Sequence, residues 1–171
     1  LLREMKVGPD EPVGALHAGA NWLLKRWPAG HFARLADELA RRHGARVLFI
    51  GGPDDLPLIR GITARMSTEP LVAAGRTTFR QMGALLARTR LLISNDSGPL
   101  HMGIAVGTPV VALFGPTQPE LTGPPAGAKA VTLFGSIGCP VPCYRLNCPA
   151  NLCMQQISVE QVLEAAGRFL S

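Results

Sequence analysis

Short, continuous apolar runs alternate along the chain with segments whose apolar residues recur every three or four positions. The runs lack the period-two alternation of half-exposed strands, so they predict strands that are buried on both faces. The predicted strands are 13–16, 46–50, 71–74, 91–93, 109–114 and 130–134, of which the last has the faintest pattern. The predicted helices are 28–43, 56–66, 78–88, 97–106 and 158–169.

Local signals mark the ends of these helices. Gly44 follows the last periodic residue of the first helix, as a C-terminal cap does. Thr78 with Gln81, and Ser158 with Gln161, have the spacing of capping boxes. Strands and helices therefore alternate almost throughout, which predicts an α/β fold with a doubly wound parallel sheet of about six strands. Ligands of such sheets bind beyond the carboxyl ends of the strands.

The stretch from Ile93 to His101 reads as the end of a buried strand, a tight turn and the start of a helix. A turn of small residues between a strand and a helix directs several backbone N–H groups at one point, and the helix dipole makes that point attractive to an anion. Asp96, Ser97 and His101 add polar side chains beside it. The stretch therefore predicts a ligand site, with helix capping by Asp96 or Ser97 and a packed histidine as the alternative.

Length and composition limit the class of protein. A chain of 171 residues, 47% of them hydrophobic and 17% charged, is long enough to bury a full core in one domain. No apolar run approaches the ~20 residues that span a bilayer. Residues 1–12 are expected to be a linker or tail, and residues 13–171 the folded domain. The beginning of the chain reads as a cut at a domain boundary in a longer protein, and no signal peptide is visible in it.

The net charge of +5 suits a phosphorylated or polyanionic partner. The basic residues are scattered and aromatic residues make up only 5% of the chain, whereas nucleic-acid binders gather basic residues with interleaved aromatics. We therefore expect no nucleic-acid partner. The sequence has neither the G-x-G-x-x-G fingerprint of dinucleotide-binding domains nor a Walker A motif.

Four motifs, in this order and spacing, resemble the C-terminal, donor-binding domain of the heptosyltransferase family. These bacterial glycosyltransferases build the inner core of lipopolysaccharide. The resemblance covers nearly the whole chain from about Val13. The motifs are 17–19 with 25–28, 51–55, 96–101 and 110–117.

The resemblance implies the C-terminal half of a two-domain, inverting glycosyltransferase that binds ADP-heptose or a related nucleotide sugar between two Rossmann-like domains. It implies that Lys25 reaches the diphosphate and acts in catalysis with Asp96. Asp54 or Asp55 would accept the ribose hydroxyls, with the register open by one residue. The remaining residues expected to bind substrate are His17, Gly19, Ser97, Gly98, His101 and Thr117, with Thr122 as a further candidate in the same loop. No cofactor and no metal ion are expected.

The resemblance also implies an acceptor, the lipopolysaccharide core, that would bind through an N-terminal domain. That domain would supply the aspartate general base. The expected location is the cytoplasmic face of the inner membrane, with peripheral membrane contact. Two other functions stay open: a nucleotide-sugar epimerase, because such epimerases carry a similar Asp-Ser-Gly turn, and a non-catalytic nucleotide-sugar binding module.

All four cysteines lie in one proline-rich segment, the Cys-rich loop 139–153. Their spacing is looser than the paired C-x2-C arrays of zinc ribbons, so a structural metal is an alternative to free thiols and not the expectation. Reduced thiols are expected in the cell, and disulfides would need an oxidising compartment. The segment is expected to be dispensable for nucleotide binding because it is far from the Asp96 turn in sequence.

Overall fold

The computed structural model describes residues 1–143, 145 and 148–170. Ser171 and residues 144, 146 and 147 of the Cys-rich loop lie outside the described residues. Six strands form one sheet in the order β3-β2-β1-β4-β5-β6, and every neighbouring pair is parallel. This confirms the predicted doubly wound, Rossmann-like α/β fold. The strands are β1 (Val13–His17), β2 (Arg46–Phe49), β3 (Leu71–Val72), β4 (Leu91–Asn95), β5 (Val110–Phe114) and β6 (Ala130–Phe134).

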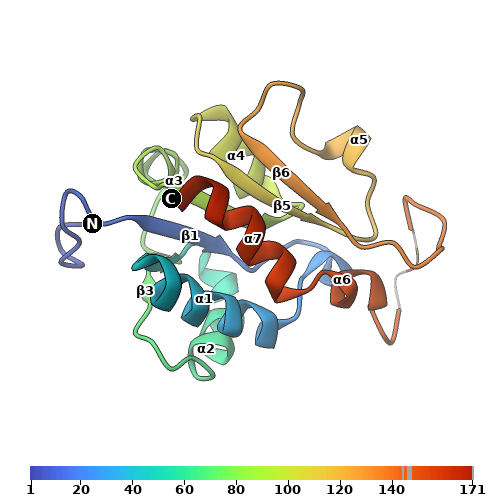
Figure 1. The fold of residues 1–171 in the computed structure, drawn as a ribbon, viewed down its shortest axis with the longest axis horizontal. Helices are drawn as coiled ribbons and strands as arrows, with labels where there is room; N and C mark the ends of the chain where they lie inside the picture. Colours follow the sequence, from blue (N-terminus) through green and yellow to red (C-terminus); the bar gives the residue numbers. More distant parts are fainter. Residues whose placement is uncertain (144, 146–147, 171) are drawn as a thin grey trace.

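Helices cover the sheet on both faces (Figure 1). On one face lie α1 (Ala29–His43), α2 (Leu56–Thr63) and α7 (Val159–Leu170), and α7 packs beside α1. The other face is covered by α3 (Phe79–Leu86) and α4 (Gly98–Ala105). Strands β1, β2, β4 and β5 contribute side chains to both cores, which explains why their apolar runs are continuous. Edge strand β6 is half exposed, which explains its fainter pattern.

The helix boundaries follow the sequence signals. Gly44 ends α1 with a φ of 60°, a left-handed conformation that glycine adopts without a Cβ penalty. Thr78 and Gln81 form the reciprocal capping box of α3, with backbone-to-side-chain distances of 2.8 and 3.3 Å. Ser158 and Gln161 do the same before α7, at 2.8 and 3.1 Å. Four elements too short for a periodic signal were not predicted: η1 (Leu23–Lys25), η2 (Pro53–Asp55), α5 (Pro119–Thr122) and α6 (Leu152–Gln156).

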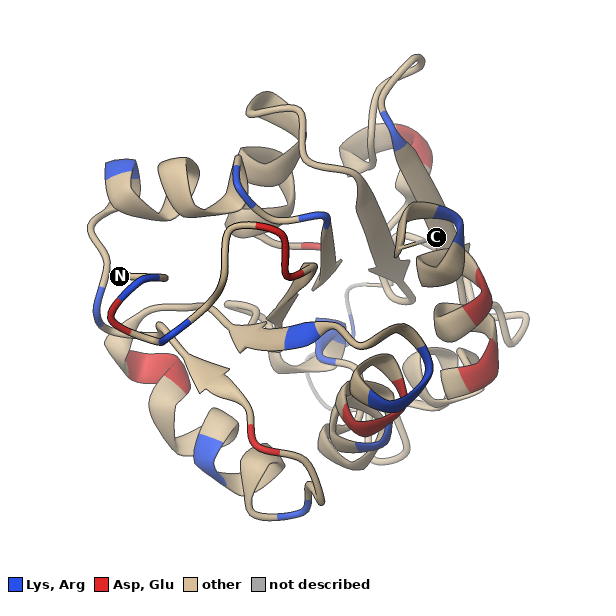
Figure 2. Ribbon diagram, turned by 60° about the vertical axis from the view of Figure 1, so that its left-hand side comes forward, with Lys and Arg blue, Asp and Glu red and all other residues tan. Residues whose placement is uncertain are grey.

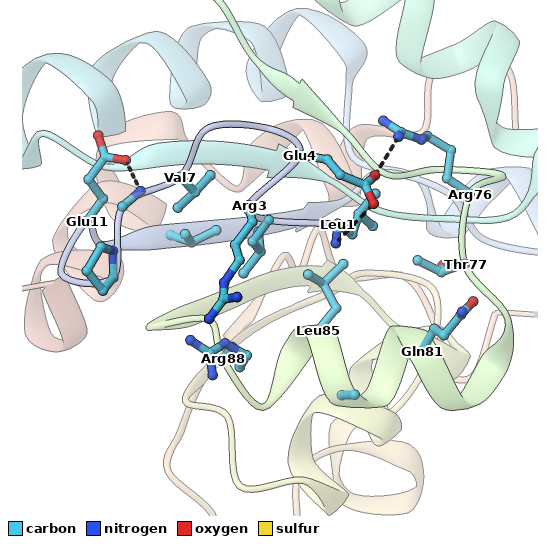
Figure 3. A pocket seen from close by; sticks show the side chains of 15 residues that line it. Leu1, Arg3, Glu4, Val7, Glu11, Arg76, Thr77, Gln81, Leu85 and Arg88 are labelled. Carbon is cyan, nitrogen blue, oxygen red and sulfur yellow. Dashed lines mark hydrogen bonds and ion pairs between the residues drawn. The ribbon is translucent and has the colours of Figure 1, made fainter.

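The first seven residues lie against the domain. Leu1, Leu2, Met5 and Val7 pack on the core beneath α3. A cavity of about 760 Å³ lies between this segment and α3 (Figure 3). Its charged lining is paired in part, since Glu4 lies 3.5 Å from Arg76. None of the residues predicted to bind substrate lines this cavity.

Charged residues are spread over the molecule. Figure 2 shows Lys and Arg interspersed with Asp and Glu on helices, strands and loops. Within the described part of the chain, no helix is both long enough and apolar enough to cross a membrane.

Candidate functional site

A cleft of about 800 Å³ opens at the carboxyl ends of β1, β2 and β4. Its position agrees with the location expected for a ligand in a doubly wound sheet. Most of the residues predicted from sequence to bind substrate meet here. The lining includes His17, Lys25, Asp54, Asp55, Asp96, Ser97, Gly98 and His101, together with Thr122.

Lys25 and Asp96 form an ion pair at the edge of the cleft. The Lys25 Nζ lies 2.7 Å from Asp96 Oδ2. The same oxygen accepts hydrogen bonds from the hydroxyls of Thr117 at 2.7 Å and Thr122 at 3.4 Å. Asp96 is only 5% exposed, whereas the Lys25 side chain keeps 23% exposure toward the cleft. Asp96 is the one hydrogen-bond partner of this ammonium among the described residues, so it fixes the side chain and leaves two of the three N–H groups for a ligand.

Lys25 is the last residue of the short η1 turn, and Asn95 makes hydrogen bonds to the chain on both sides of this turn. Asn95 is fully buried at the end of β4, and its side-chain amide donates to the carbonyl of Ala18 at 2.9 Å. Its Oδ1 accepts the backbone N–H of Trp27 at 3.1 Å. Sequence reasoning gave Asn95 no role, although a polar residue that ends a buried apolar strand is a signal that could have found it.

Trp27 is part of the core and not of the cleft lining. It is 2% exposed and lies edge-on to Phe32 of α1, with ring centroids 5.0 Å apart. Its indole N–H donates to the carbonyl of Ile157 at 2.9 Å. Trp27 is therefore a core residue that packs against the first helix.

A second polar chain runs from Asp55 through His17 to Ser97. His17 ends β1 in register with Ser94 of β4, so the two side chains meet at the same edge of the sheet. The His17 Nδ1 lies 3.0 Å from Ser97 Oγ, and Ser97 Oγ lies 3.1 Å from Ser94 Oγ. On the other side of the ring, Nε2 lies 3.6 Å from Asp55 Oδ2.

The backbone is shaped to hold Asp55 in this place. The backbone N–H of Gly52 donates to Asp55 Oδ2 at 2.9 Å. A Cβ at Gly19 would overlap the Asp55 carboxylate, and a Cβ at Gly51 would lie 2.5 Å from its Oδ2. The close approach of the His17 ring and the hydrogen bond from Gly52 hold the pKa of Asp55 below its ordinary value against the opposing effect of burial.

The predicted site residues thus fall into three groups. Lys25, Asp96 and Thr117 meet at one carboxylate oxygen, and His17, Asp55 and Ser97 form the second chain. Asp54, Gly98 and His101 line the cleft, where a Cβ on Gly98 would meet no protein atom within 4 Å.

Gly19 and Thr117 do not line the cleft. Gly19 leaves the space that the Asp55 carboxylate fills, and Thr117 donates a hydrogen bond to Asp96. Sequence reasoning missed the further lining residues Asn21, Trp22 and Arg26.

The Cys-rich loop contacts the loop that carries Lys25 and the loop that carries Thr117, which bonds Asp96. The backbone N–H of Cys143 donates to the carbonyl of Pro116 at 2.7 Å, next to Thr117. The side-chain amide of Asn151 donates to the carbonyl of Arg26 at 3.4 Å, next to Lys25. Distance in sequence therefore does not separate this loop from the site in space, and the reason given for its dispensability does not hold.

The four cysteines are free thiols in the structure. Burial raises the pKa of the Cys153 thiol above its ordinary value. Among the described residues, no group of three or more His, Cys, Asp or Glu side chains is placed to hold a metal ion.

A doubly wound parallel sheet with a polar cleft at its carboxyl edge defines a Rossmann-like ligand-binding domain. The chain belongs to glycosyltransferase family 9 (heptosyltransferase), whose family model matches residues 3–153. It is 36% identical over 135 residues to lipopolysaccharide heptosyltransferase 2 of Salmonella typhimurium. This alignment covers 76% of this chain and 38% of that protein.

Two solved structures have the same fold. The glycosyl transferase family 9 protein of Veillonella parvula matches with a TM-score of 0.83 at 33% identity, over 99% of this chain and 49% of that one. The ADP-heptose lps heptosyltransferase II of E. coli matches with a TM-score of 0.84 at 29% identity, over 99% and 49% of the two chains. The chain thus spans about half the length of these two structures, and less of the Salmonella relative.

Proposed function

We propose that this chain is the donor-binding half of an inverting glycosyltransferase that transfers heptose from ADP-heptose to the lipopolysaccharide inner core. The observation that carries the proposal is the meeting of Lys25 and the N-terminus of α4 at one cleft. Both offer positive charge or N–H donors to the same place, as a nucleotide diphosphate requires. Family membership supports the choice of a sugar nucleotide as the ligand.

The chemistry follows from the charge that develops during transfer. Breaking the bond from the anomeric carbon to the diphosphate leaves an additional negative charge on ADP. The Lys25 ammonium and the first turn of α4 are fixed in place before the reaction, so they stabilise this charge without reorganising. Asp96 holds Lys25 at 2.7 Å and is thereby a residue that positions the lysine in this proposal.

The nucleoside end of the donor is assigned to Asp54. Both aspartates of the 51–55 motif line the cleft, but Asp55 is turned to His17 while Asp54 is exposed. A free carboxylate accepts hydrogen bonds from a pair of ribose hydroxyls. We assign His101, which also lines the cleft, to the phosphates or the sugar.

The acceptor side is proposed to lie outside this chain. Inversion needs a general base on the acceptor hydroxyl, on the face opposite the leaving diphosphate. Asp96 is paired with Lys25 and Asp55 with His17, so neither carboxylate is free for this task. We propose that an N-terminal domain supplies the base and the lipopolysaccharide-core site, that residues 13–171 form the donor domain, and that the enzyme works at the cytoplasmic face of the inner membrane in peripheral contact with it.

The test is nucleotide selectivity measured on residues 1–171. Calorimetric titrations with ADP-heptose, ADP, UDP and UDP-glucose are compared at one salt concentration. We expect ADP-heptose and ADP to bind and the uridine nucleotides to bind more weakly. Equal binding of all four, or binding of none, would overturn the proposal. Conversion of ADP-heptose to an epimeric sugar nucleotide would instead support an epimerase.

A further inference from the structure

Ser97 occupies the N-cap position of α4 without capping it. An N-cap serine ordinarily accepts a hydrogen bond from a backbone N–H in the first turn. The Ser97 side chain makes no such bond, and its backbone is extended, with φ −159° and ψ 168°. Its hydroxyl instead lies 3.0 Å from His17 Nδ1 and 3.1 Å from Ser94 Oγ. The hydroxyl is therefore held away from the helix.

This diversion matters because the first turn of α4 has few donors. Pro99, the second helical residue, has no N–H, so the N–H of Leu100 is the donor that a serine cap would take. In the structure the N–H of Leu100 lies 3.1 Å from the backbone carbonyl of Ser97, and for the N–H of Gly98 no hydrogen bond occurs among the described residues. A capping hydroxyl would occupy the position over the first turn that a phosphate oxygen takes.

The histidine that holds the hydroxyl is itself fixed from three sides. It is buried, with 4% exposure, and the register of β1 with β4 places it beside Ser94. Asp55 lies 3.6 Å from its other ring nitrogen. Gly52 binds Asp55 at 2.9 Å, and Gly19 leaves the space that the carboxylate fills. The ring therefore has one orientation, in which Nδ1 faces Ser97.

We propose that Asp55 and His17 are positioning residues that keep the Ser97 hydroxyl off the N-terminus of α4, so that the first turn of the helix is open to the donor's diphosphate. The inference rests on the proposed function, because it takes a diphosphate to be the anion bound there. It also gives the two adjacent aspartates different roles. Asp54 faces the ligand, and Asp55 acts on it only through His17 and Ser97.

The test is a double-mutant cycle with inorganic pyrophosphate as the titrant, because pyrophosphate reports the diphosphate site without the nucleoside. Replacing His17 by Ala removes one of the two side-chain partners of the Ser97 hydroxyl, which can then turn from Ser94 to cap α4. A serine cap is worth ~1 kcal/mol, so pyrophosphate should bind about five-fold more weakly to His17→Ala. In a Ser97→Ala background no hydroxyl remains to compete, and the further change His17→Ala should leave the affinity unchanged.

Two controls separate this account from general damage. In His17→Asn the side-chain amide replaces Nδ1 as a partner for Ser97, so this variant should bind pyrophosphate like the wild type. His43→Ala removes a histidine that does not line the cleft and should also leave binding unchanged. Thermal unfolding of every variant shows that it is folded.

The outcomes distinguish the inference from the proposed function. If the wild type binds neither pyrophosphate nor ADP, the proposed function and the inference both fail. If the wild type binds but His17→Ala binds equally well, or loses the same affinity with and without the Ser97 hydroxyl, only the inference fails.

Discussion

The Lys25 ammonium lies 2.7 Å from the Asp96 carboxylate, although 71 positions separate the two residues in the chain. The loop after β1 carries the lysine and the turn after β4 carries the aspartate, and β1 and β4 are neighbours in the sheet. The strand order 3-2-1-4 therefore creates this pair, because it brings the carboxyl ends of β1 and β4 side by side.

Because the Asp55 carboxylate fills the space beside Gly19, the stability of the protein should be sensitive to a side chain at position 19. Gly19→Ala should lower the melting temperature, because the new Cβ overlaps the Asp55 carboxylate and must displace it. Gly61→Ala is the matched control, since a Cβ at Gly61 in α2 meets no atom within 4 Å. Alanine is favoured over glycine inside a helix by ~0.5–1 kcal/mol, so the control should be slightly stabilised. A melting temperature of Gly19→Ala at or above that of the wild type would contradict the geometry.

The hydrogen bonds of Asp37 predict how the free energy of unfolding depends on pH. Burial raises the pKa of the Asp37 carboxyl, but hydrogen bonds from the Ser67 and Thr68 backbone N–H groups and hydroxyls outweigh burial and leave the pKa below its ordinary value. The unfolded chain therefore binds this proton more readily than the folded chain does. The stabilisation is fully present above the unfolded pKa of ~3.9 and is lost as the pH falls through the lower folded pKa.

Urea denaturation of Asp37→Asn checks this account. Hydrogen bonds to a charged group are worth ~1.5–3 kcal/mol, and we expect a loss of this order at pH 7 that shrinks as the pH falls toward 3. Asp10→Asn is the control, because Asp10 is exposed and should change little at either pH. A loss for Asp37→Asn that is equal at both pH values would show that the charge is not responsible.

For the cysteines we predict reduced, metal-free thiols in protein purified under reducing conditions. Elemental analysis should find substoichiometric zinc and iron, and a thiol titration under denaturing conditions should count all four thiols. One equivalent of metal per chain, with unfolding on chelation, would establish a structural metal site instead.

Residues 1–171 alone should not transfer heptose. Positioning of the acceptor can contribute ~7–11 kcal/mol of barrier lowering, and we assign the acceptor site and its base to another domain. Incubation with ADP-heptose and a lipopolysaccharide-core acceptor, followed by mass spectrometry of the acceptor, should show no product above background. Robust turnover would require a general base among the described carboxylates.

The fold could be predicted from sequence because its signals are local. Continuous apolar runs, the Gly44 cap and the two capping boxes each act within a few residues, and their alternation specifies a parallel sheet. Strand β3 is shorter than predicted, at two residues against four, although the backbone N–H of Ala73 still donates to the carbonyl of Phe49 at 2.9 Å.

The candidate site was predictable only in part. His17 and Ser97 follow strands that were recognised, so their meeting at one edge follows from the fold. Both Asp54 and Asp55 line the cleft, but which of them is turned to His17 depends on the η2 turn, which is too short to leave a periodic signal. The contact of Thr117 with Asp96 depends on the path of a loop, for which sequence pattern gives no geometry.

The central claim is that Lys25 binds the diphosphate of an adenine nucleotide, and calorimetry with ADP tests it most directly. Lys25→Ala removes one charge-assisted contact of ~1.5–3 kcal/mol, so its affinity should fall roughly ten- to a hundred-fold. Lys129→Ala removes an exposed lysine that does not line the cleft and should bind ADP like the wild type. Equal affinity of Lys25→Ala and the wild type would remove Lys25 from the site and contradict the account.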